Sequence, residues 1–425
     1  MFANLKQIFN PKNKDIRKKI LFTLFALFIF KLGTTIIVPG INKYELGTHN
    51  LGFLELINVM GGGALERFSI FGLGVMPYIT ASIVIQLAQM DIIPYLAELA
   101  KEGHTGRVKI NKITRVLGII LAFIQGYIMS FAFIKNGTVL DYMQFATVLT
   151  AGTSFLLWMG DQITAKGIGN GISLIIMAGI IASVPTMFMQ TWEIFTEDYS
   201  SLGILFFVLF VIIYLLIVIG IIFEQSAEKR IPIQYANKST SYLGKQNYIP
   251  FKLNSAGVIP VIFASSLLSI PAMFVGMINN SKYEEFITNY VALDTVTGFI
   301  MYFILIILFT YFYTFVQLKP KEMTENLQKN GGYIPGIRPG EETENYIKTI
   351  IYRLTFVGSL SLAFIAGLPI VFSMVSKLPA NISIGGTGIL IVVGVALETY
   401  NSLDSQLSSR MYTSTRKRGR RRWKV

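Results

Sequence analysis

The chain has 425 residues, of which 52% are hydrophobic and only 14% are charged. Soluble domains usually carry about 25% charged residues, so this composition indicates a membrane protein. The formal net charge of +13 resides mainly between long apolar runs, which favours a role in membrane orientation over nucleic-acid binding. The absence of cysteine excludes disulfides and thiolate sites, and the two histidines, His49 and His104, lie in separate loops.

Apolar runs of about the length of a membrane span recur along the whole chain. Backbone groups in lipid must be satisfied within their own segment, so we predict a helix for each run. A basic stretch precedes the first run, but no small-residue cleavage site follows it. We therefore interpret that run as a retained span and not as a signal peptide. The ten predicted spans are residues 20–38, 71–90, 113–134, 144–160, 172–190, 202–223, 257–278, 298–318, 350–372 and 382–400.

The basic residues are distributed unevenly between the two sets of loops that these spans define. Of the 37 Lys and Arg residues, 31 lie in the terminal segments and in every second loop. Cytoplasmic loops of membrane proteins are enriched in Lys and Arg, so both termini are predicted to be cytoplasmic. The two long cytoplasmic loops, 224–256 and 319–349, are either solvated connectors or docking sites for a partner.

The second predicted span contains Gly72, Gly74 and Pro77. A proline removes a helix hydrogen bond, and in lipid such a break persists only where protein or water satisfies the freed groups. The span is therefore either an ordinary kinked helix or a helix beside a cavity. The segment before it, about 53–69, contains the glycine triplet 61–63 and is apolar enough to lie inside a cavity; the alternative is an external loop.

Two further spans begin with distinctive sequences. KGIGNGIS at 166–173 is not preceded by a strand, so it predicts a tight turn into a close-packed helix and not a dinucleotide site. The seventh span contains Pro260 and Pro271. Its Ser265 and Ser266 are expected to bond backbone carbonyls or a neighbouring helix.

The sequence GGYIPGIRPG at 331–340 predicts a stiff, turn-rich tip. This tip is either an exposed turn or a surface that presents Arg338 to the carboxylates of a partner. The basic end of the chain, from Arg416, is predicted to attract anionic lipid and to enforce topology, in preference to binding RNA.

Ionisable residues within the predicted spans are few; Lys31 lies in the first span and Glu398 near the end of the tenth. This scarcity disfavours ion-coupled transport, a charged selectivity ring and an intramembrane protease. No P-loop is present, so any ATP use must come from a partner. We predict no catalytic residue, no metal site and no cofactor, and hence no enzyme.

Six stretches together carry a resemblance to a known family. In this combination and order the chain is similar to the SecY family of protein-conducting channels, over most of its length. The stretches are GGALERFSIFGLGVMPYITASIVIQL (62–87), GDQITAKGIGNGISLIIMAGI (160–180), KRIPIQYANK (229–238), FKLNSAGVIPVIFASSLLSIP (251–271), GGYIPGIRPGEET (331–343) and GTGILIVVGVALET (386–399).

This resemblance implies an all-α, polytopic fold with ten transmembrane helices. They would form two pseudo-symmetric five-helix halves, 1–201 and 202–425, around an hourglass pore. It also implies an apolar ring at the constriction, and an aliphatic collar offers ions no polar site. The ring positions are Val75, Ile79, Ile172, Ile176, Ile262 and Ile391.

The resemblance further assigns a plug, a lateral gate and partner-binding residues. The plug positions are Phe53, Leu54, Gly61, Gly62, Gly63, Ala64 and Leu65. The gate positions are Thr80, Ser265, Ser266 and Ile270, and the partner-binding positions are Lys229, Arg230 and Arg338. The implied partners are the small membrane subunits SecE and SecG, the SecA ATPase motor, the ribosome, signal sequences and unfolded polypeptide.

The resulting hypothesis is a gated conduit for unfolded polypeptide in the bacterial plasma membrane. Two alternatives are a secondary transporter with broken helices and an insertase or lipid-handling scaffold without a through-pore. The transporter would need a polar substrate site at mid-membrane depth, which the sequence does not show. Conductance after plug deletion would separate a channel from a scaffold.

Overall fold

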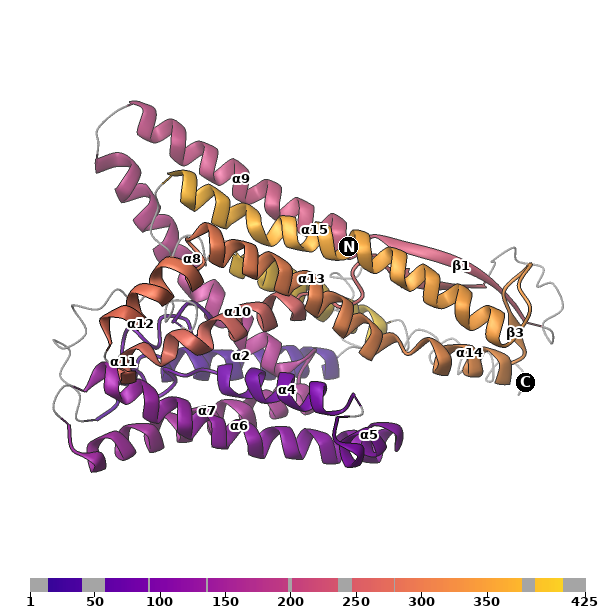
Figure 1. The fold of residues 1–425 in the computed structure, drawn as a ribbon, viewed down its shortest axis with the longest axis horizontal. Coiled ribbons are helices and arrows are strands. Elements are labelled where there is room, and N and C mark those ends of the chain that lie inside the picture. Colours follow the sequence, from indigo (N-terminus) through magenta and orange to yellow (C-terminus); the bar gives the residue numbers. More distant parts are fainter. Residues whose placement is uncertain are drawn as a thin grey trace. The chain divides into compact units, whose positions relative to one another are not determined.

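The structure is a computed structural model that describes residues 14–39, 58–90, 92–134, 137–197, 201–235, 247–278, 280–376 and 387–407. The chain divides into two compact units, shown as a ribbon in Figure 1. The first unit comprises residues 1–190, 269–287 and 391–425, and the second comprises 191–268 and 288–390. Several of these boundaries fall inside helices, so single helices contribute residues to both units.

The first unit is built from helices. Helix α6 packs against both α4 and α7, and α7 also contacts α2 (Figure 1). Its helices are α2 (Lys14–Gly33), α4 (Met76–Ala88), α5 (Pro94–Lys101), α6 (His104–Phe133), α7 (Val139–Lys166), α8 (Gly171–Glu197, up to Gln190), α11 (Val275–Ile278), α12 (Ser281–Phe286) and most of a helix over 387–407.

The connection between α7 and α8 is a tight turn. Gly169 has a φ of +75°, and a Cβ on Gly171 would lie 1.9 Å from the carbonyl oxygen of Gly160. The two helices therefore approach closely at these glycines, which confirms the close-packed turn predicted from KGIGNGIS.

The second unit combines helices with a small sheet. Helix α15 packs against α9, α13 and α14. The elements are α9 (Ser201–Ser226), β1 (Glu228–Tyr235), β2 (Asn247–Lys252), α10 (Ile259–Met273, up to Leu268), η2 (Ile287–Val291, from Thr288), α13 (Val296–Leu318), α14 (Pro320–Lys329), β3 (Gly332–Tyr333) and α15 (Glu341–Ser376).

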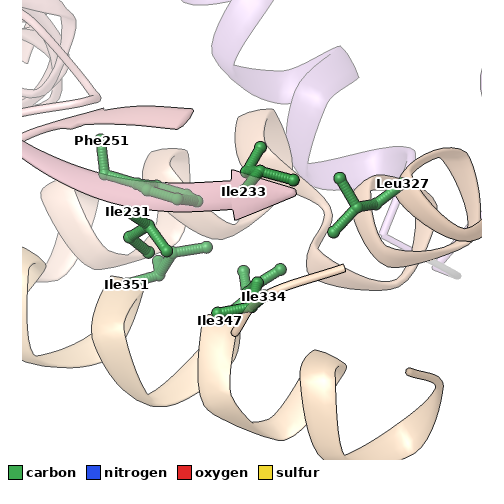
Figure 2. Packing of buried hydrophobic residues seen from close by; sticks show 7 residues of the cluster. All are labelled: Ile231, Ile233, Phe251, Leu327, Ile334, Ile347 and Ile351. Carbon is green, nitrogen blue, oxygen red and sulfur yellow. The ribbon is translucent and has the colours of Figure 1, made fainter. Parts of the chain in front are cut away.

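The three strands form an antiparallel sheet in the order β2-β1-β3, with Ile231 opposite Ile249 and Gln234 opposite Tyr333. Apolar side chains alternate along β1, and one face of the sheet is buried against α14 and α15. Figure 2 shows this cluster, which consists of Ile231, Ile233, Phe251, Leu327, Ile334, Ile347 and Ile351. The long loops that the sequence predicted at 224–256 and 319–349 are therefore largely structured around a core of their own.

Every predicted span overlaps a described helix. Five of the described helices are long and apolar enough to cross a membrane, and α4 and α10 are shorter apolar helices. The polytopic, helical fold class is confirmed, and the number of ten spans is consistent with it. The sheet was not predicted, since its strands lie in polar loops.

Two prolines act differently from a simple kink. Pro77 lies in the first turn of α4, so it begins a helix where its missing N–H costs nothing. Residues 71–75 precede that helix as turns. Pro271 lies near the end of α10, which breaks before α11, and the carbonyl of Pro271 accepts a hydrogen bond of 2.8 Å from the Tyr283 hydroxyl.

Candidate functional site

The segment before α4 folds into consecutive turns within the first unit. Its end pairs with the residues after α2: Ile37 and Ser69 form an antiparallel bridge. The N–H of Val38 donates to the carbonyl of Phe68 at 2.7 Å, and the N–H of Ile70 donates to the carbonyl of Ile36 at 3.0 Å. Residues 58–69 are the described part of the plug predicted at about 53–69, and we call them the plug segment.

The plug segment is closed on itself by Asn58. The side-chain oxygen of Asn58 accepts from the N–H of Glu66 at 3.0 Å, and its backbone carbonyl accepts from the N–H of Gly63 at 2.8 Å. Ala64 and Leu65, at 0% and 4% exposure, point inward. The segment is therefore a compact, buried fold and not an open external loop.

The plug segment lies directly against α8. A Cβ on Gly179 would lie 2.1 Å from the carbonyl oxygen of Met60, and Gly62 faces the Cα of Gly179. Gly62 has a φ of +72°, a conformation that other residues rarely adopt. The Ser183 hydroxyl also donates to the carbonyl of Val59, at 3.4 Å. Small residues on α8 thus form the surface on which the plug segment rests.

The start of α4 is held by α7. The backbone turns at Gly74, where φ is +56°, and the Thr153 hydroxyl of α7 donates to the carbonyl of Gly74 at 3.1 Å. Thr153 is fully buried. The break before α4 is therefore satisfied by a protein donor, as an interruption at membrane depth requires.

The predicted ring residues are nearly all buried. Val75 and Ile79 lie at the start of α4, Ile172 and Ile176 on α8, and Ile391 on the helix 387–407 of the first unit. Only Ile172 is half-buried. Ile262, on α10, is 8% exposed and belongs to the second unit. Their convergence in one ring stays a prediction.

The predicted gate residues are divided between α4 and α10. The Thr80 hydroxyl donates to the carbonyl of Met76 at 3.2 Å. The Ser265 hydroxyl bonds the carbonyls of Val261 and Ile262, so it satisfies the backbone of its own helix. Ser266 is buried and Ile270 is half-buried. The gate assignment also stays a prediction.

The predicted partner-binding residues lie on the structured loops of the second unit. Lys229 and Arg230 are exposed on β1, and Arg338 is exposed between β3 and α15. Arg230 pairs with Glu228 at 2.6 Å and stacks on the Tyr248 ring. The hydrogen bond to Glu228 raises the pKa of Arg230. None of the ion pairs found among the described residues involves Arg338, which leaves its guanidinium available to a partner.

Replacing Ile347 by Ala is expected to loosen the surface that presents these residues. Ile347 is fully buried in the core of Figure 2, and such a truncation costs about 2–5 kcal/mol. Limited proteolysis of the detergent-solubilised protein should then cleave faster at the basic residues of the sheet. Tyr346→Ala, on the exposed side of the same helix, is the control. Equal cleavage of the Ile347 and Tyr346 variants would contradict the prediction.

Some predicted positions fall outside the described residues, and some functional contacts were not predicted. The plug positions Phe53 and Leu54 lie outside the described residues. Gly179, Ser183 and Thr153 were missed. A glycine near the middle of a span was the available signal for Gly179, but nothing in the sequence indicated its partner.

Among the described residues, no group of three or more His, Cys, Asp or Glu could hold a metal ion.

Comparison with known proteins agrees with this geometry. A sequence model of the SecY family matches residues 69–400. The protein translocase subunit SecY of Staphylococcus aureus (strain NCTC 8325 / PS 47) is 49% identical over 416 residues, which cover 94% of this chain and 96% of that protein. That of Staphylococcus epidermidis (strain ATCC 35984) is 48% identical over 427 residues, covering 97% of this chain and 99% of that protein.

The fold is also that of solved channel structures. A SecY structure concerned with how the plug domain stabilises the closed channel and maintains a membrane seal has a TM-score of 0.68, with 20% identity over 93% of each chain. Sec61 in the canine ribosome–channel complex from the endoplasmic reticulum has a TM-score of 0.66, with 18% identity over 93% of each chain.

These findings define a polytopic helical membrane protein of the channel class. Its first unit holds a folded segment against small residues of α8, and its second carries a structured loop surface. The family match covers more than half of the chain. The chain belongs to the SecY family.

Proposed function

We propose that this chain is the pore-forming subunit of a protein-conducting channel in the bacterial plasma membrane. The observation that carries the proposal is the 49% identity, over 94% of the chain, to a protein translocase subunit. The chain is a channel subunit and not an enzyme. The cargo is unfolded secretory polypeptide, and membrane segments of the cargo leave sideways into lipid.

The plug segment supports a closed resting state. It is buried, bonded to itself through Asn58 and seated on Gly179 of α8. In this mechanism a signal sequence opens the gate, the plug segment leaves α8, and the aliphatic ring fits around the moving chain. Apolar cargo segments then partition into lipid, favoured by about 0.8 kcal/mol per buried methylene.

The distribution of basic residues supports the proposed orientation, and the family resemblance supports the proposed internal organisation. Both termini and the structured loops of the second unit face the cytoplasm, because 31 of 37 Lys and Arg residues lie on that side. The two halves, 1–201 and 202–425, surround the pore.

The proposed partners are the small membrane subunits SecE and SecG, the SecA motor and the ribosome. One structural relative is a Sec61 channel bound to a ribosome, which supports ribosome docking for this chain as well. The exposed Lys229, Arg230 and Arg338 supply the cationic contacts that such partners would use. Energy comes from the motor or from translation.

Reconstitution tests the proposed function directly. The chain, co-purified with its small subunits, is placed in proteoliposomes with the motor, ATP and a preprotein. Protease-protected preprotein is the expected product. If protected preprotein appears equally in liposomes without the chain, the proposed function is wrong.

Reversing one charge on the loop surface should uncouple the motor. Arg338→Glu is expected to reduce ATP-driven export at least about tenfold, because a charge-assisted hydrogen bond is worth roughly 1.5–3 kcal/mol. Initial export rates at equal channel amounts measure the effect. Lys329→Glu, the same reversal of charge at an exposed residue of α14 that pairs with Glu325, is the matched control. Equal rates for the two variants would remove Arg338 from motor docking.

A further inference from the structure

A buried glutamate, Glu224, lies near the end of α9, and no ion pair among the described residues compensates its charge. Glu224 is only 3% exposed. Burial of an uncompensated carboxyl group is costly, so such groups in membrane proteins usually serve a function. Four residues later, Glu228 is exposed and paired with Arg230, the ordinary arrangement for an acid.

The neighbours of Glu224 come from the segment that leads into α10 and from α15. The Ser361 hydroxyl donates to Glu224 Oε1 at 3.4 Å, and the Asn254 side chain interacts with the same carboxyl group. Asn254 is also 3% exposed, and its amide nitrogen donates to the carbonyl of Gly257 at 2.9 Å. Two buried oxygens here, Glu224 Oε2 and Asn254 Oδ1, have no hydrogen-bond partner among the described residues.

Residues 253–257, which lead into α10 and which we call the lead-in segment, are also held by backbone contacts. The N–H of Leu253 donates to the carbonyl of Ala227 at 2.8 Å. A Cβ on Gly358 of α15 would lie 2.3 Å from the carbonyl oxygen of Leu253, so α15 touches the segment directly. Residues 253–257 are therefore held between the end of α9 and the middle of α15, all within the second unit.

The lead-in segment positions the start of α10. This helix begins at Ile259, two residues after Gly257, and carries Ile262, Ser265 and Ser266. Those residues are the ring and gate positions of the proposed function. A shift of the lead-in segment would displace or rotate the first turns of α10, because helix and segment are continuous.

We propose that Glu224 is a positioning residue which, through Asn254, fixes the start of α10 and thereby sets how readily the gate opens. The inference rests on the proposed function, because only there does α10 form part of a gate. The role needs a polar side chain of the length of Glu, and it does not need a charge.

The chain offers a graded set of variants. Glu224→Gln keeps the acceptor for Ser361 and adds an amide donor for the unpartnered oxygen of Asn254. Glu224→Ala removes both interactions. Gly358→Ala adds a methyl group on α15 that displaces the carbonyl of Leu253 and leaves the Glu224 side chain unchanged. Glu228→Gln removes an acidic charge outside the cluster and is the matched control.

The experiment measures selectivity and not only export. Cells that depend on each variant export one preprotein with an intact signal sequence and the same preprotein with a charge in the signal's apolar core. The readout is the ratio of defective-signal to intact-signal export, at matched membrane levels of the variants. A merely structural loss lowers both rates together and leaves the ratio unchanged.

Glu224→Ala and Gly358→Ala are expected to raise this ratio about fivefold, in line with the loss of one buried hydrogen bond, whereas the two Gln variants stay within about twofold of the wild type. An unchanged ratio in both Ala variants overturns the inference. If Glu224→Ala does not accumulate, Gly358→Ala alone decides. Failure of the wild-type chain to export the intact preprotein would instead contradict the proposed function.

Discussion

Gly179→Val is expected to release the plug segment and to open an ion leak in the absence of any preprotein. Even a Cβ at this position would lie 2.1 Å from the carbonyl oxygen of Met60 and 3.1 Å from the N–H nitrogen of Gly62. Both neighbours are backbone atoms, so the plug segment must move as a whole. Overpacking of this kind costs about 1–3 kcal/mol, which shifts the closed-to-open equilibrium roughly 5- to 150-fold.

Conductance of the reconstituted channel across a planar bilayer measures the leak. Gly220→Val on α9 is the matched control, because among the described residues a Cβ there meets only the side chain of Ile365, at 4.0 Å. The natural chain has no cysteine, so Ala64→Cys gives one unique thiol. Ala64 is fully buried, and its labelling by a polar maleimide should rise only in the Gly179 variant. If conductance and labelling match those of the Gly220 variant, the plug segment does not rest on Gly179.

Hydropathy predicted the helical part of this fold well because lipid leaves few alternatives for an apolar backbone. Each predicted span overlaps a described helix. Proline was harder to interpret from sequence alone. Pro77 could kink a helix or begin one, and the break before it is satisfied by a hydrogen bond to the carbonyl of Gly74 from Thr153 of α7, three helices further along the chain.

The candidate site could be predicted only in part, because its contacts are between segments distant in sequence. The resemblance predicted a plug in this part of the chain, but it did not predict the contact of the plug segment with Gly179, which joins residues more than a hundred positions apart. The sheet β2-β1-β3 was missed for the same reason. The apolar side chains of β1, Ile231 and Ile233, are buried only because they pack against Ile347 and Ile351 of α15, more than a hundred positions away. Local polarity therefore suggested loops and not strands.

Ile79→Asn is expected to make the pore constriction permeable to ions. Ile79 is 6% exposed at the start of α4, and an amide there would hold water in a collar that is otherwise aliphatic. Loss of the apolar contribution of one such side chain, about 1.5–3 kcal/mol, corresponds to a roughly 10- to 150-fold weaker seal at the ring, and the measured leak rises up to the limit that the plug segment sets. Val84→Asn, on the same helix but 47% exposed, should conduct like the wild type. A leak of the same size from Val84→Asn would mean that Ile79 does not line the pore.

The plug segment and the ring are proposed to be two seals in series, and this arrangement predicts how the two substitutions combine. When one seal of a series is removed, the other still limits the current. The double variant Gly179→Val, Ile79→Asn should therefore conduct more than the sum of the two single variants. Independent leaks through separate paths would add, and a sum equal to the double variant would contradict a shared pore. The comparison thus tests whether Gly179 of α8 and Ile79 of α4 act on one conduit.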